Sequence, residues 1–437
     1  MSSPLIEDLI DRLRSRRAHV GVIGLGYVGL PLAVEFAKAG FTTTGFDVDV
    51  EKTRRIVAGD PCGVGVSQAD IEATVASGRF TATTDFTRLA DLDSVNICVP
   101  TPLRKTKDPD LSHIVAAVEE IARHQRAGQL IILESTTYPG TVEELVQPRL
   151  EAGGLRGGED FFLAFSPERV DPGNKDWTTA NIPKVVGGIN DASTAVAKTL
   201  YEQVVSTVVP VSSSRVAEMV KLLENTFRAV NIGLVNELAL MSRDLGVDVW
   251  EVIDAASTKP FGFMPFYPGP GLGGHCIPID PYYLSWKARQ NGFESRFIEL
   301  AGYINAGMPR FVVERVVSAL SQNRKPLRDA RVHLFGVAYK PGVRDVRESP
   351  AIDIAQLLQR GGAVVSYSDP YVPRVEQGEV ALEEVPSQIA LERGVDCAVI
   401  TTSHPEFDYA AIVSLAPCIV DTRNALKRFS GDHIHRL

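Results

Sequence analysis

Short apolar runs alternate with amphipathic stretches along the first half of the chain. The runs have the length and composition of buried strands, and the stretches between them have a helical period. The apolar runs cover residues 18–23, 94–99, 130–133 and 161–165, and a further strand is expected over residues 41–46. Strands that alternate with helices in this way predict a parallel sheet with helices on its faces. We therefore expect a doubly wound α/β domain over residues 1–210.

The same alternation returns near the end of the chain. Apolar runs of strand type cover residues 332–337, 364–367, 396–401 and 418–421, and a helical stretch covers 351–359. This pattern predicts a second α/β domain over residues 325–437, without the glycine-rich turn that the first domain carries.

A single long helix is predicted between the two domains. Residues 212–245 contain no proline, and their apolar positions recur at a helical period, with serines before the start and Gly246 after the end. A helix of this length spans about 45–50 Å. We assign residues 211–324 to a central linking and dimerisation domain. The predicted fold class is therefore α/β, with two doubly wound Rossmann-like domains joined by a long central helix.

Composition and charge narrow the class of protein. The chain is 44% hydrophobic and 23% charged, which is typical of a globular protein, and its net charge of −9 argues against nucleic-acid or membrane partners. Its cysteines, at positions 62, 98, 276, 397 and 418, form no CxxC pair. This spacing predicts neither a disulfide framework nor a metal site, and it fits a reducing cytoplasm. The first residues carry charges throughout and lack an apolar signal core.

A dinucleotide fingerprint follows the first predicted strand. Gly24, Gly26 and Gly29 form a G-x-G-x-x-G turn between a strand and a helix, and the next strand ends at Asp47. The glycines allow the tight turn, the approach of a pyrophosphate and helix packing, while the carboxylate suits a ribose 2′-hydroxyl. The pattern predicts NAD as cofactor, although the basic residues Lys52, Arg54 and Arg55 nearby weaken the preference over NADP.

Polar residues stand at the carboxyl ends of the later strands, where open parallel sheets bind ligands. Thr101, Ser135 and Thr136 are such residues, and they either contact a ligand or simply end their strands. Glu168 follows the 161–165 run and is either a solvated charge or a base that orients water. Thr141 to Glu144 has the spacing of a capping box at a helix start.

The segment 266–286, FYPGPGLGGHCIPIDPYYLSW, is rich in glycine and proline, so no helix is expected in it. Gly273 and Gly274 permit a close backbone approach just before Cys276, and Asp280 follows four residues later. A thiol on a stiff loop beside a carboxylate is a candidate covalent nucleophile. The alternative is an inert structural cysteine.

Two further sets of polar residues are candidates for ligand contact. Lys221 and Asn225 lie one turn apart on the long helix, where they either hold an oxyanion or form an exposed pair. Lys340 and Arg347 belong to a basic loop before the 351–359 helix, which suits phosphate groups. The second ligand is therefore expected to be a nucleotide that carries the substrate.

Taken together, these motifs resemble the UDP-sugar 6-dehydrogenases over residues 18–425. The resemblance rests, in order, on GLGYVGLPLA, the PTP turn, ESTTYPGT, FSPER, KLLENTFRAVNIGLVNE, GGHCIPIDP and GVAYKPGVRDVRESPA. It implies NAD-dependent oxidation of a sugar C6 alcohol to a carboxylate by two hydride transfers. Ile279 stands where UDP-glucose enzymes usually have lysine, so the loop most resembles the UDP-N-acetylglucosamine enzymes of polysaccharide synthesis. UDP-glucose, UDP-N-acetylgalactosamine and UDP-N-acetylmannosamine remain open.

The resemblance also implies roles for individual residues. The catalytic set is Cys276 as nucleophile with Lys221, Asn225, Asp280, Glu168 and Thr136. The cofactor set is Gly24, Gly26, Tyr27, Val28, Gly29, Asp47, Thr101, Ser135, Thr136 and Arg347. The substrate set is Glu168, Arg169, Lys221, Asn225, Phe266, Tyr267, Gly273 and Lys340. The expected partners are a UDP-sugar and a second copy of the chain, with a higher oligomer open. A single-hydride hydroxyacid dehydrogenase and a non-enzymatic NAD-binding sensor are the alternatives from other classes.

Overall fold

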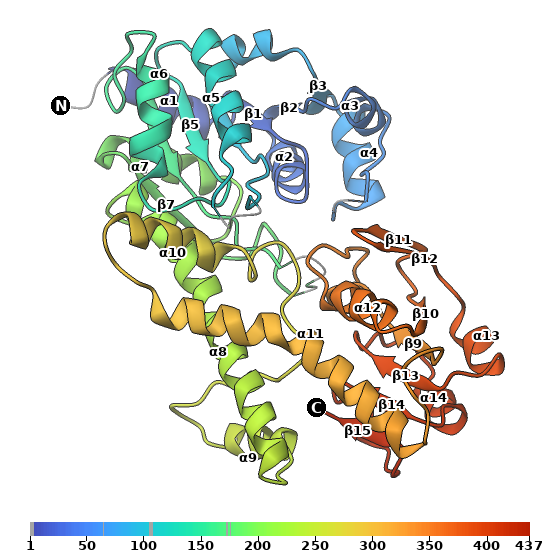
Figure 1. Ribbon diagram of the computed structural model, residues 1–437. Helices are drawn as coiled ribbons and strands as arrows, with labels where there is room; N and C mark the ends of the chain where they lie inside the picture. Colours follow the sequence, from blue (N-terminus) through green and yellow to red (C-terminus); the bar gives the residue numbers. More distant parts are fainter. Residues whose placement is uncertain (1–3, 64, 105–107, 172–173, 175) are drawn as a thin grey trace. The chain divides into compact units, whose positions relative to one another are not determined.

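The computed structural model describes residues 4–63, 65–104, 108–171, 174 and 176–437 (Figure 1). The chain packs as two compact units. Unit 1 consists of Met1–Glu224 with Tyr282–Asn291, and unit 2 of Asn225–Pro281 with Gly292–Leu437. This division reflects packing, and the three domain boundaries expected from the sequence stay predictions.

Unit 1 is built on an eight-stranded sheet in the order β3-β2-β1-β4-β5-β6-β7-β8. The strands are β1 (His19–Ile23), β2 (Thr42–Phe46), β3 (Phe80–Thr83), β4 (Ser94–Ile97), β5 (Leu130–Leu133), β6 (Phe162–Phe165), β7 (Lys184–Gly188) and β8 (Val208–Pro210). Neighbours pair in parallel except β6 with β7. The order from β3 to β6 is that of a dinucleotide-binding sheet.

Helices cover both faces of this sheet. They are α1 (Pro4–Arg14), α2 (Gly29–Lys38), α3 (Val50–Val57), α4 (Gln68–Ala76), η1 (Phe86–Asp91), α5 (Ser112–His124), the π-helical turn η2 (Val142–Val146), α6 (Gln147–Glu151) and α7 (Asp191–Tyr201). In β5, Leu130 and Ile132 join the core beneath α2 and α7, while Ile131 and Leu133 join the core beneath α5. Because successive side chains alternate between faces, a strand buried on both sides is apolar throughout.

Unit 2 contains a second parallel sheet, in the order β10-β9-β13-β14-β15. Its strands are β9 (Arg331–Phe335), β10 (Val364–Ser368), β13 (Cys397–Ile400), β14 (Ile419–Asp421) and β15 (Ile434–Arg436), and β11 (Arg374–Gln377) forms a hairpin with β12 (Val380–Glu383). The helices around it are α11 (Arg296–Gln322), α12 (Pro350–Arg360), α13 (Ser387–Glu392) and α14 (Tyr409–Leu415), while α9 (Val249–Ser257) packs against the end of the long helix that precedes it. The predicted fold class, with two parallel sheets of Rossmann type, is confirmed.

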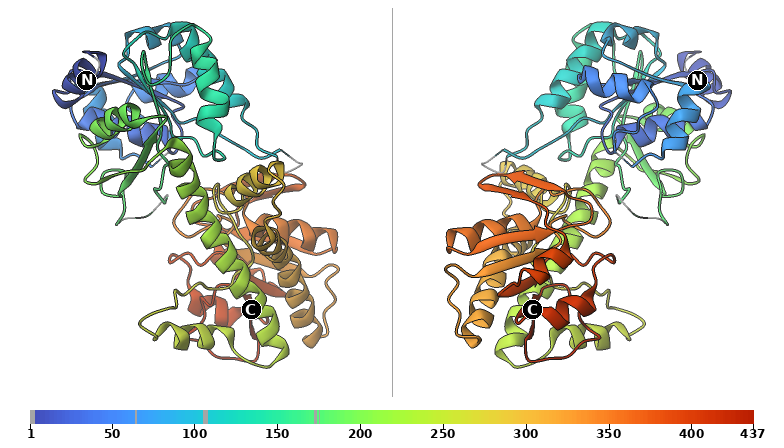
Figure 2. Two further views of the ribbon diagram at one scale, coloured as in Figure 1. Left: turned by 90° about the vertical axis from the view of Figure 1, so that its left-hand side faces the viewer. Right: turned by 90° about the vertical axis from the view of Figure 1, so that its right-hand side faces the viewer.

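The long helix predicted between the sheets is α8 (Ser214–Asp244), which is 31 residues long and contributes to both units (Figure 2). Within unit 2 it packs against α11, where a Cβ added to Gly233 would lie 3.0 Å from Ala301. Glycine at this position therefore lets the two helices approach closely.

Among the helices of the described residues, none combines the length and the apolar character that a membrane-spanning segment needs.

The capping box expected at Thr141 is wrong. The Thr141 hydroxyl donates instead to the carbonyl of Tyr138, and the segment from Val142 opens as a π-helical turn. The buried carboxylate of Glu218 on α8 accepts from the amides of Gly140 (2.5 Å) and Val142 (2.9 Å). A distant side chain thus satisfies the orphan donors that a local cap normally takes.

Candidate active site

The glycine-rich turn after β1 has the geometry that each glycine was expected to supply. Gly24 has φ +90°, and a Cβ there would lie 2.6 Å from the carbonyl oxygen of Cys98. A Cβ on Gly29 would lie 1.8 Å from the carbonyl oxygen of Gly24. A Cβ on Gly26, in contrast, would meet no described atom within 4 Å. Gly24 and Gly29 are therefore needed by the fold, whereas the space at Gly26 is open to a ligand.

The start of α2 fits a pyrophosphate. Its N-cap residue is Val28, whose side chain has no oxygen to accept from the first amides of the helix. Uncapped amides and the helix dipole together favour an anion at this place. Tyr27 stands beside the turn with 42% of its surface exposed. The residues present therefore fit NAD, and Gly26 leaves room for the phosphates.

Asp47, at the end of β2, is fixed by three contacts. Its Oδ2 accepts from the amide of Leu25 (3.0 Å) and from Nζ of Lys52 (2.9 Å), and its Oδ1 accepts from the amide of Asp49 (3.1 Å). Burial raises the pKa of Asp47, but Lys52 and the two amides outweigh burial and lower it. The carboxylate is therefore ionised near neutral pH and tied to the fingerprint turn.

Two of the three polar residues at the next strand ends have hydrogen bonds within unit 1. The hydroxyl of Ser135 donates to the carbonyl of Val99 (2.8 Å), and the carbonyl of Thr101 accepts from the hydroxyl of Tyr283 (2.9 Å). Thr136 is half-buried. Because Ser135 uses its hydrogen on the protein, it can offer a ligand only its lone pairs.

Glu168 follows β6 and is held as a carboxylate. Its Oε1 accepts from the amides of Arg169 (2.8 Å) and Val170 (2.7 Å), and its Oε2 lies 3.3 Å from Nζ of Lys184. Burial raises the pKa of Glu168, but Lys184, the backbone amides and Lys221 outweigh burial and lower it. An ionised carboxylate at a strand end can orient water or accept a proton.

Lys221 is buried rather than exposed, so the alternative of a surface pair with Asn225 is wrong. Its Nζ donates to the carbonyl oxygen of Glu168 at 2.5 Å, within unit 1. Arg169 next to Glu168 pairs with Glu224 of α8 (2.7 Å) and donates to the carbonyl of Pro183 (2.8 Å). The segment after β6 is therefore tied to the first half of α8.

In unit 2, Asn225 is buried and donates to Oδ2 of Asp280 at 2.6 Å. The side-chain amide of Asn225 therefore holds the carboxylate of Asp280 in place.

The expectation that residues 266–286 hold no helix is wrong, because α10 (Asp280–Gln290) begins at Asp280. Pro281 occupies the first turn, where the missing N–H costs nothing. The carbonyl of Cys276 accepts from the amides of Ile279 (3.0 Å) and Asp280 (2.8 Å). The half-buried Cys276 therefore lies on the turn that leads directly into the helix carrying Asp280.

The loop before Cys276 packs closely on the basic loop 339–349. Cβ atoms on Gly273 and Gly274 would lie 2.7 Å and 2.8 Å from side-chain atoms of Tyr339. The amide of Gly274 donates to the carbonyl of Arg347 at 3.1 Å. The Arg347 side chain pairs with Asp345 (2.6 Å), and Nζ of Lys340 lies 5.9 Å from the Tyr339 ring. The two glycines thus bring the candidate nucleophile next to the candidate phosphate loop.

Phe266 and Tyr267 belong to a loop of unit 2, and their rings pack against its helices. The ring of Phe266 is 5.6 Å from that of Phe227 on α8, and Tyr267 stacks on Trp250 of α9 at 5.8 Å. The Tyr267 hydroxyl donates to Asp254 at 2.9 Å. The expected role of these two residues in lining a sugar pocket stays a prediction.

Reasoning from the sequence missed a buried polar cluster in unit 1. Nζ of Lys184 at the start of β7 lies 2.6 Å from Oε2 of Glu134, and the Tyr201 hydroxyl donates to Oε1 of Glu134 at 2.5 Å. Lys184 and Glu134 are 2% exposed each. The sequence did contain a signal for this cluster. Glu134 directly follows the apolar strand β5, and Lys184 stands at the start of the apolar strand β7. A charged side chain at such a buried position is rare without a partner.

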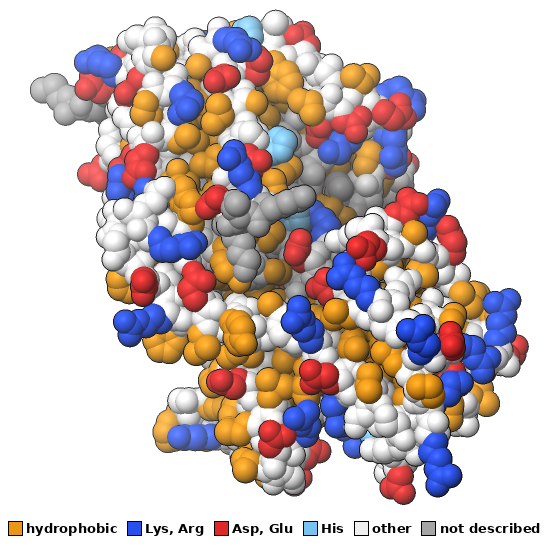
Figure 3. All heavy atoms as spheres, in the orientation of Figure 1, with side chains coloured by type: hydrophobic (Ala, Val, Ile, Leu, Met, Phe, Trp, Pro, Cys, Tyr) orange, Lys and Arg blue, Asp and Glu red, His pale blue; other side chains and the backbone are white. Residues whose placement is uncertain are grey.

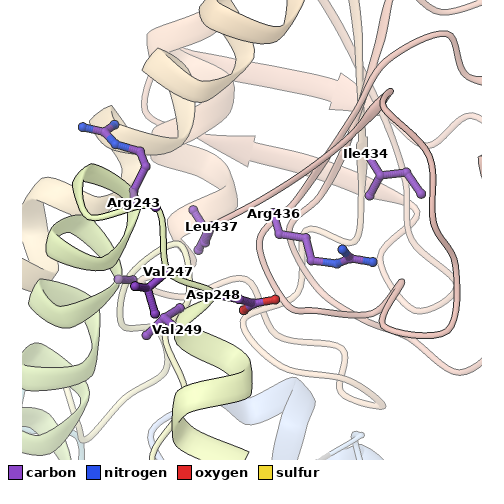
Figure 4. A pocket seen from close by; sticks show the side chains of 9 residues that line it. Arg243, Val247, Asp248, Val249, Ile434, Arg436 and Leu437 are labelled. Atoms are coloured by element: carbon purple, nitrogen blue, oxygen red, sulfur yellow. The ribbon is translucent and has the colours of Figure 1, made fainter.

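A pocket of about 270 Å³ lies elsewhere in unit 2, at the end of α8 beside β15 (Figure 4). Its lining includes Arg243, Asp248 and Arg436, and the side chains of the two arginines point away from one another. None of the residues expected in the catalytic, cofactor or substrate sets lines it. The pocket therefore does not belong to the site around Cys276.

Three domain models of one family match successive parts of the chain. They are the NAD binding domain of the UDP-glucose/GDP-mannose dehydrogenase family over residues 18–205, its central domain over 215–307 and its UDP binding domain over 333–428. The matches follow the glycine turn, the helix α8 with the Cys276 loop, and the second sheet. The resemblance inferred from the motifs is therefore confirmed at the level of the family.

Similar proteins span nearly the whole chain. A UDP-N-acetyl-D-glucosamine 6-dehydrogenase of Pseudomonas aeruginosa is 38% identical over 89% of this chain and 91% of its own length. A solved UDP-D-ManNAc dehydrogenase of Pyrococcus horikoshii is 33% identical with a TM-score of 0.87, covering 96% of this chain and 98% of the other. An NDP-N-acetyl-D-galactosaminuronic acid dehydrogenase structure from Methanosarcina mazei is 31% identical with a TM-score of 0.81, covering 100% and 98%. The chain has the glycine-rich turn of an NAD-binding domain. It thus belongs to the UDP-glucose/GDP-mannose dehydrogenase family and is an NAD-dependent nucleotide-sugar dehydrogenase.

Proposed function

We propose that this chain oxidises the C6 hydroxyl of UDP-N-acetylglucosamine to a carboxylate, as a step in making a polysaccharide precursor. One observation supports this type of reaction. The thiol of Cys276 lies on the turn that leads into Asp280, and Asn225 holds the Asp280 carboxylate at 2.6 Å. A single-hydride dehydrogenase has no use for such a thiol. The choice of sugar is supported by the 38% identical relative from P. aeruginosa.

UDP-N-acetylmannosamine is the second candidate substrate. A UDP-N-acetyl-D-mannosamine dehydrogenase of P. horikoshii is 36% identical over 93% of this chain. The two sugars share the UDP group, the N-acetyl group and the C6 hydroxyl. Discrimination between them therefore depends on the shape of the sugar pocket.

The proposed reaction has four steps. The C6 alcohol loses a proton to a base and a hydride, which bound NAD accepts, and an aldehyde forms. The sulfur of Cys276 then adds to C6, the oxygen gains a proton, and a thiohemiacetal results. Loss of a proton and of a second hydride, which a second NAD accepts after the first NADH has left, gives a thioester. Water cleaves the C–S bond, which releases the carboxylate and regenerates the thiol.

The supporting residues act on charge and on water. Lys221 and Asn225, one turn apart in α8, stabilise the negative oxygen on C6 in the manner of an oxyanion hole. The positive charge of Lys221 also favours the thiolate of Cys276. Glu168 and Asp280 orient the attacking water, and Thr136 assists at the end of β5.

The remaining contacts hold the two nucleotides. We assign Tyr27, Val28, Asp47, Thr101, Ser135 and Arg347 to NAD, and Arg169, Phe266, Tyr267, Gly273 and Lys340 to the UDP-sugar. The start of α12 supports a phosphate at this end of the loop 339–349, because the buried hydroxyl of its N-cap residue Ser349 has no hydrogen-bond partner among the described residues. An uncapped helix start favours an anion.

The reaction is tested by stoichiometry. Purified protein is incubated with excess NAD and one equivalent of a UDP-sugar from a panel of four, and NADH is followed by absorbance. We expect two NADH per UDP-N-acetylglucosamine and slower turnover of the mannosamine, galactosamine and glucose forms. One NADH per sugar would indicate a single-hydride dehydrogenase, and no NADH with any sugar would indicate a binding protein.

We also propose that the chain works as a homodimer in the cytoplasm, built through α8 and α11. On α8, Phe227, Leu234 and Met241 recur every seven residues and are 46%, 51% and 51% exposed. On α11, Phe297 and Tyr303 are 78% and 80% exposed. Hydrophobic side chains stand among charged ones on the face of the molecule drawn in Figure 3. An apolar stripe along a helix indicates a covering partner, and a second copy supplies the same stripe.

Leu234→Lys should dissociate this dimer, because it places a charge at the centre of the stripe. We expect sedimentation to shift from twice the chain mass of 47.4 kDa to one chain. Val364→Lys, which changes a 58% exposed residue on the edge strand β10, is the control and should stay dimeric. A Leu234→Lys protein with an unchanged sedimentation coefficient places the interface elsewhere.

A further inference from the structure

Beneath Glu168 lies a chain of buried polar groups drawn from distant parts of unit 1. Tyr201 on α7 contacts Glu134 after β5, Glu134 contacts Lys184 on β7 at 2.6 Å, and Lys184 contacts Glu168 at 3.3 Å. The ammonium of Lys184 also lies 5.3 Å from the ring centroid of Tyr201. Lys184 therefore links a carboxylate in the core to a carboxylate at the carboxyl end of the sheet.

Stability alone does not explain this arrangement. Burying an ion pair costs about as much in lost hydration as the two charges regain, and an apolar pair of similar volume would serve the core as well. The next residues of β7, Val185 and Val186, are apolar and buried, so the position of Lys184 could hold an apolar residue too. A lysine at this place is therefore better explained by what it does to Glu168.

The contacts of Glu168 show how Lys184 acts on its carboxylate. The backbone amides of Arg169 and Val170 hold one carboxylate oxygen, and Lys184 holds the other. Lys221 holds the carbonyl oxygen of the same residue. Three donors from two segments thus fix the direction of a carboxylate whose side chain is only 12% exposed, and Lys221 holds the backbone of the same residue.

We propose that Lys184, itself held by Glu134 and Tyr201, is a positioning residue that fixes the direction and the negative charge of the Glu168 carboxylate during C6 oxidation. This inference rests on the proposed role of Glu168 in orienting water or accepting a proton. Lys184 touches no reacting atom and acts only through Glu168.

The charged groups around Glu168 determine the direction of the expected pH effect. Lys184 from β7 and Lys221 from α8 lower its pKa against the effect of burial, which raises it. Glu134 carries the opposite charge on the far side of Lys184, and Arg169 is already paired with Glu224. Removing Lys184 should therefore raise the pKa of Glu168, so that protonation inactivates the enzyme at a higher pH.

The test compares Lys184→Met with Lys184→Arg in steady-state assays across pH with NAD and UDP-N-acetylglucosamine. We expect Lys184→Met to lower kcat about 10- to 100-fold with little change in the KM for NAD, and to move the acidic limb of the kcat profile to higher pH. Lys184→Arg keeps the charge and should restore both the rate and the limb. Lys198→Met removes a lysine from an exposed pair with Glu202 and should leave both unchanged.

A second variant keeps the test valid if Lys184→Met fails to fold. Glu134→Gln with Lys184→Met removes one charge of each sign, so no carboxylate in the core is left unpaired. A folded double variant, judged by its thermal unfolding temperature and NAD affinity, should still show the lower kcat. Either variant with the wild-type kcat and acidic limb overturns the inference.

Glu168→Gln separates this inference from the proposed function. A large loss of kcat in Glu168→Gln together with wild-type behaviour in the Lys184 variants overturns the positioning role alone. Wild-type kcat in Glu168→Gln overturns the role of Glu168 in the proposed function, and the positioning role with it. Loss in both, with rescue by arginine, supports the two together.

Discussion

Replacing Cys276 by serine should abolish conversion of the UDP-sugar to the acid, with kcat falling by at least about 1000-fold. A serine hydroxyl is far less acidic than a thiol, so it adds to an aldehyde less readily, and an oxygen ester is hydrolysed less easily than a thioester. The first hydride transfer does not need the sulfur. We therefore expect at most a burst of NADH, followed by little turnover, when NADH and the uronate product are measured together.

The control for this variant is Cys62→Ser. Cys62 is also half-buried, but it lies in unit 1 on the turn after α3 and belongs to none of the expected catalytic, cofactor or substrate sets. This variant should turn over at the wild-type rate, and both variants should bind NAD with wild-type affinity. Sustained production of two NADH per sugar by Cys276→Ser would remove the thioester from the mechanism.

Gly26→Ala should weaken NAD binding by about 10- to 100-fold while leaving the apo protein as stable as the wild type. The added Cβ meets no described atom within 4 Å in the protein, so the fold has room for it. The same space is where a pyrophosphate approaches the backbone, so the methyl group and the cofactor compete. Calorimetric titration with NAD measures the first effect, and thermal unfolding without NAD measures the second.

Gly153→Ala is the matched control for Gly26→Ala. A Cβ on Gly153 likewise meets no described atom within 4 Å, and this residue lies in the turn after α6. Neither stability nor NAD affinity should change. Equal NAD affinity in Gly26→Ala and the wild type would mean that the open space at Gly26 is not the phosphate site.

The parts of the fold that could be predicted from the sequence are those with local causes. The strands β5, β6 and β13 are short apolar runs buried on both faces, so their composition alone indicates them. Gly24 and Gly29 of the fingerprint are likewise recognisable, because a positive φ at Gly24 and the contact of Gly29 with Gly24 leave no other residue type suitable.

The parts that could not be predicted depend on residues far apart in the sequence. Glu134 and Lys184 are 50 positions apart, and only the pairing of β5 through β6 to β7 brings them together. Thr141 was expected to cap a helix, but Glu218 from α8 takes the amides that a cap would bind. In each case a long-range partner replaced the local one that a short motif suggests.

The start of α10 shows the opposite error, in which a local rule was applied too widely. Proline breaks a helix interior, but Pro281 stands in the first turn, where it is well tolerated. The glycines and prolines before Asp280 form the loop, and the same Asp280 opens the helix. The rule was sound for residues 266–279 and failed at the boundary.

The threefold anchoring of Asp47 has a consequence for redesigning the enzyme to use NADP. The usual first step, exchanging the acid after β2 for a small neutral residue, would here also release the amide of Leu25 inside the glycine turn and leave Lys52 without its counter-charge. A successful exchange has to retain an acceptor at this position, as asparagine does, and recruit the freed Lys52 to the additional phosphate. Coenzyme selectivity and the rigidity of the cradle are thus coupled through one carboxylate, and engineers should expect to alter both together.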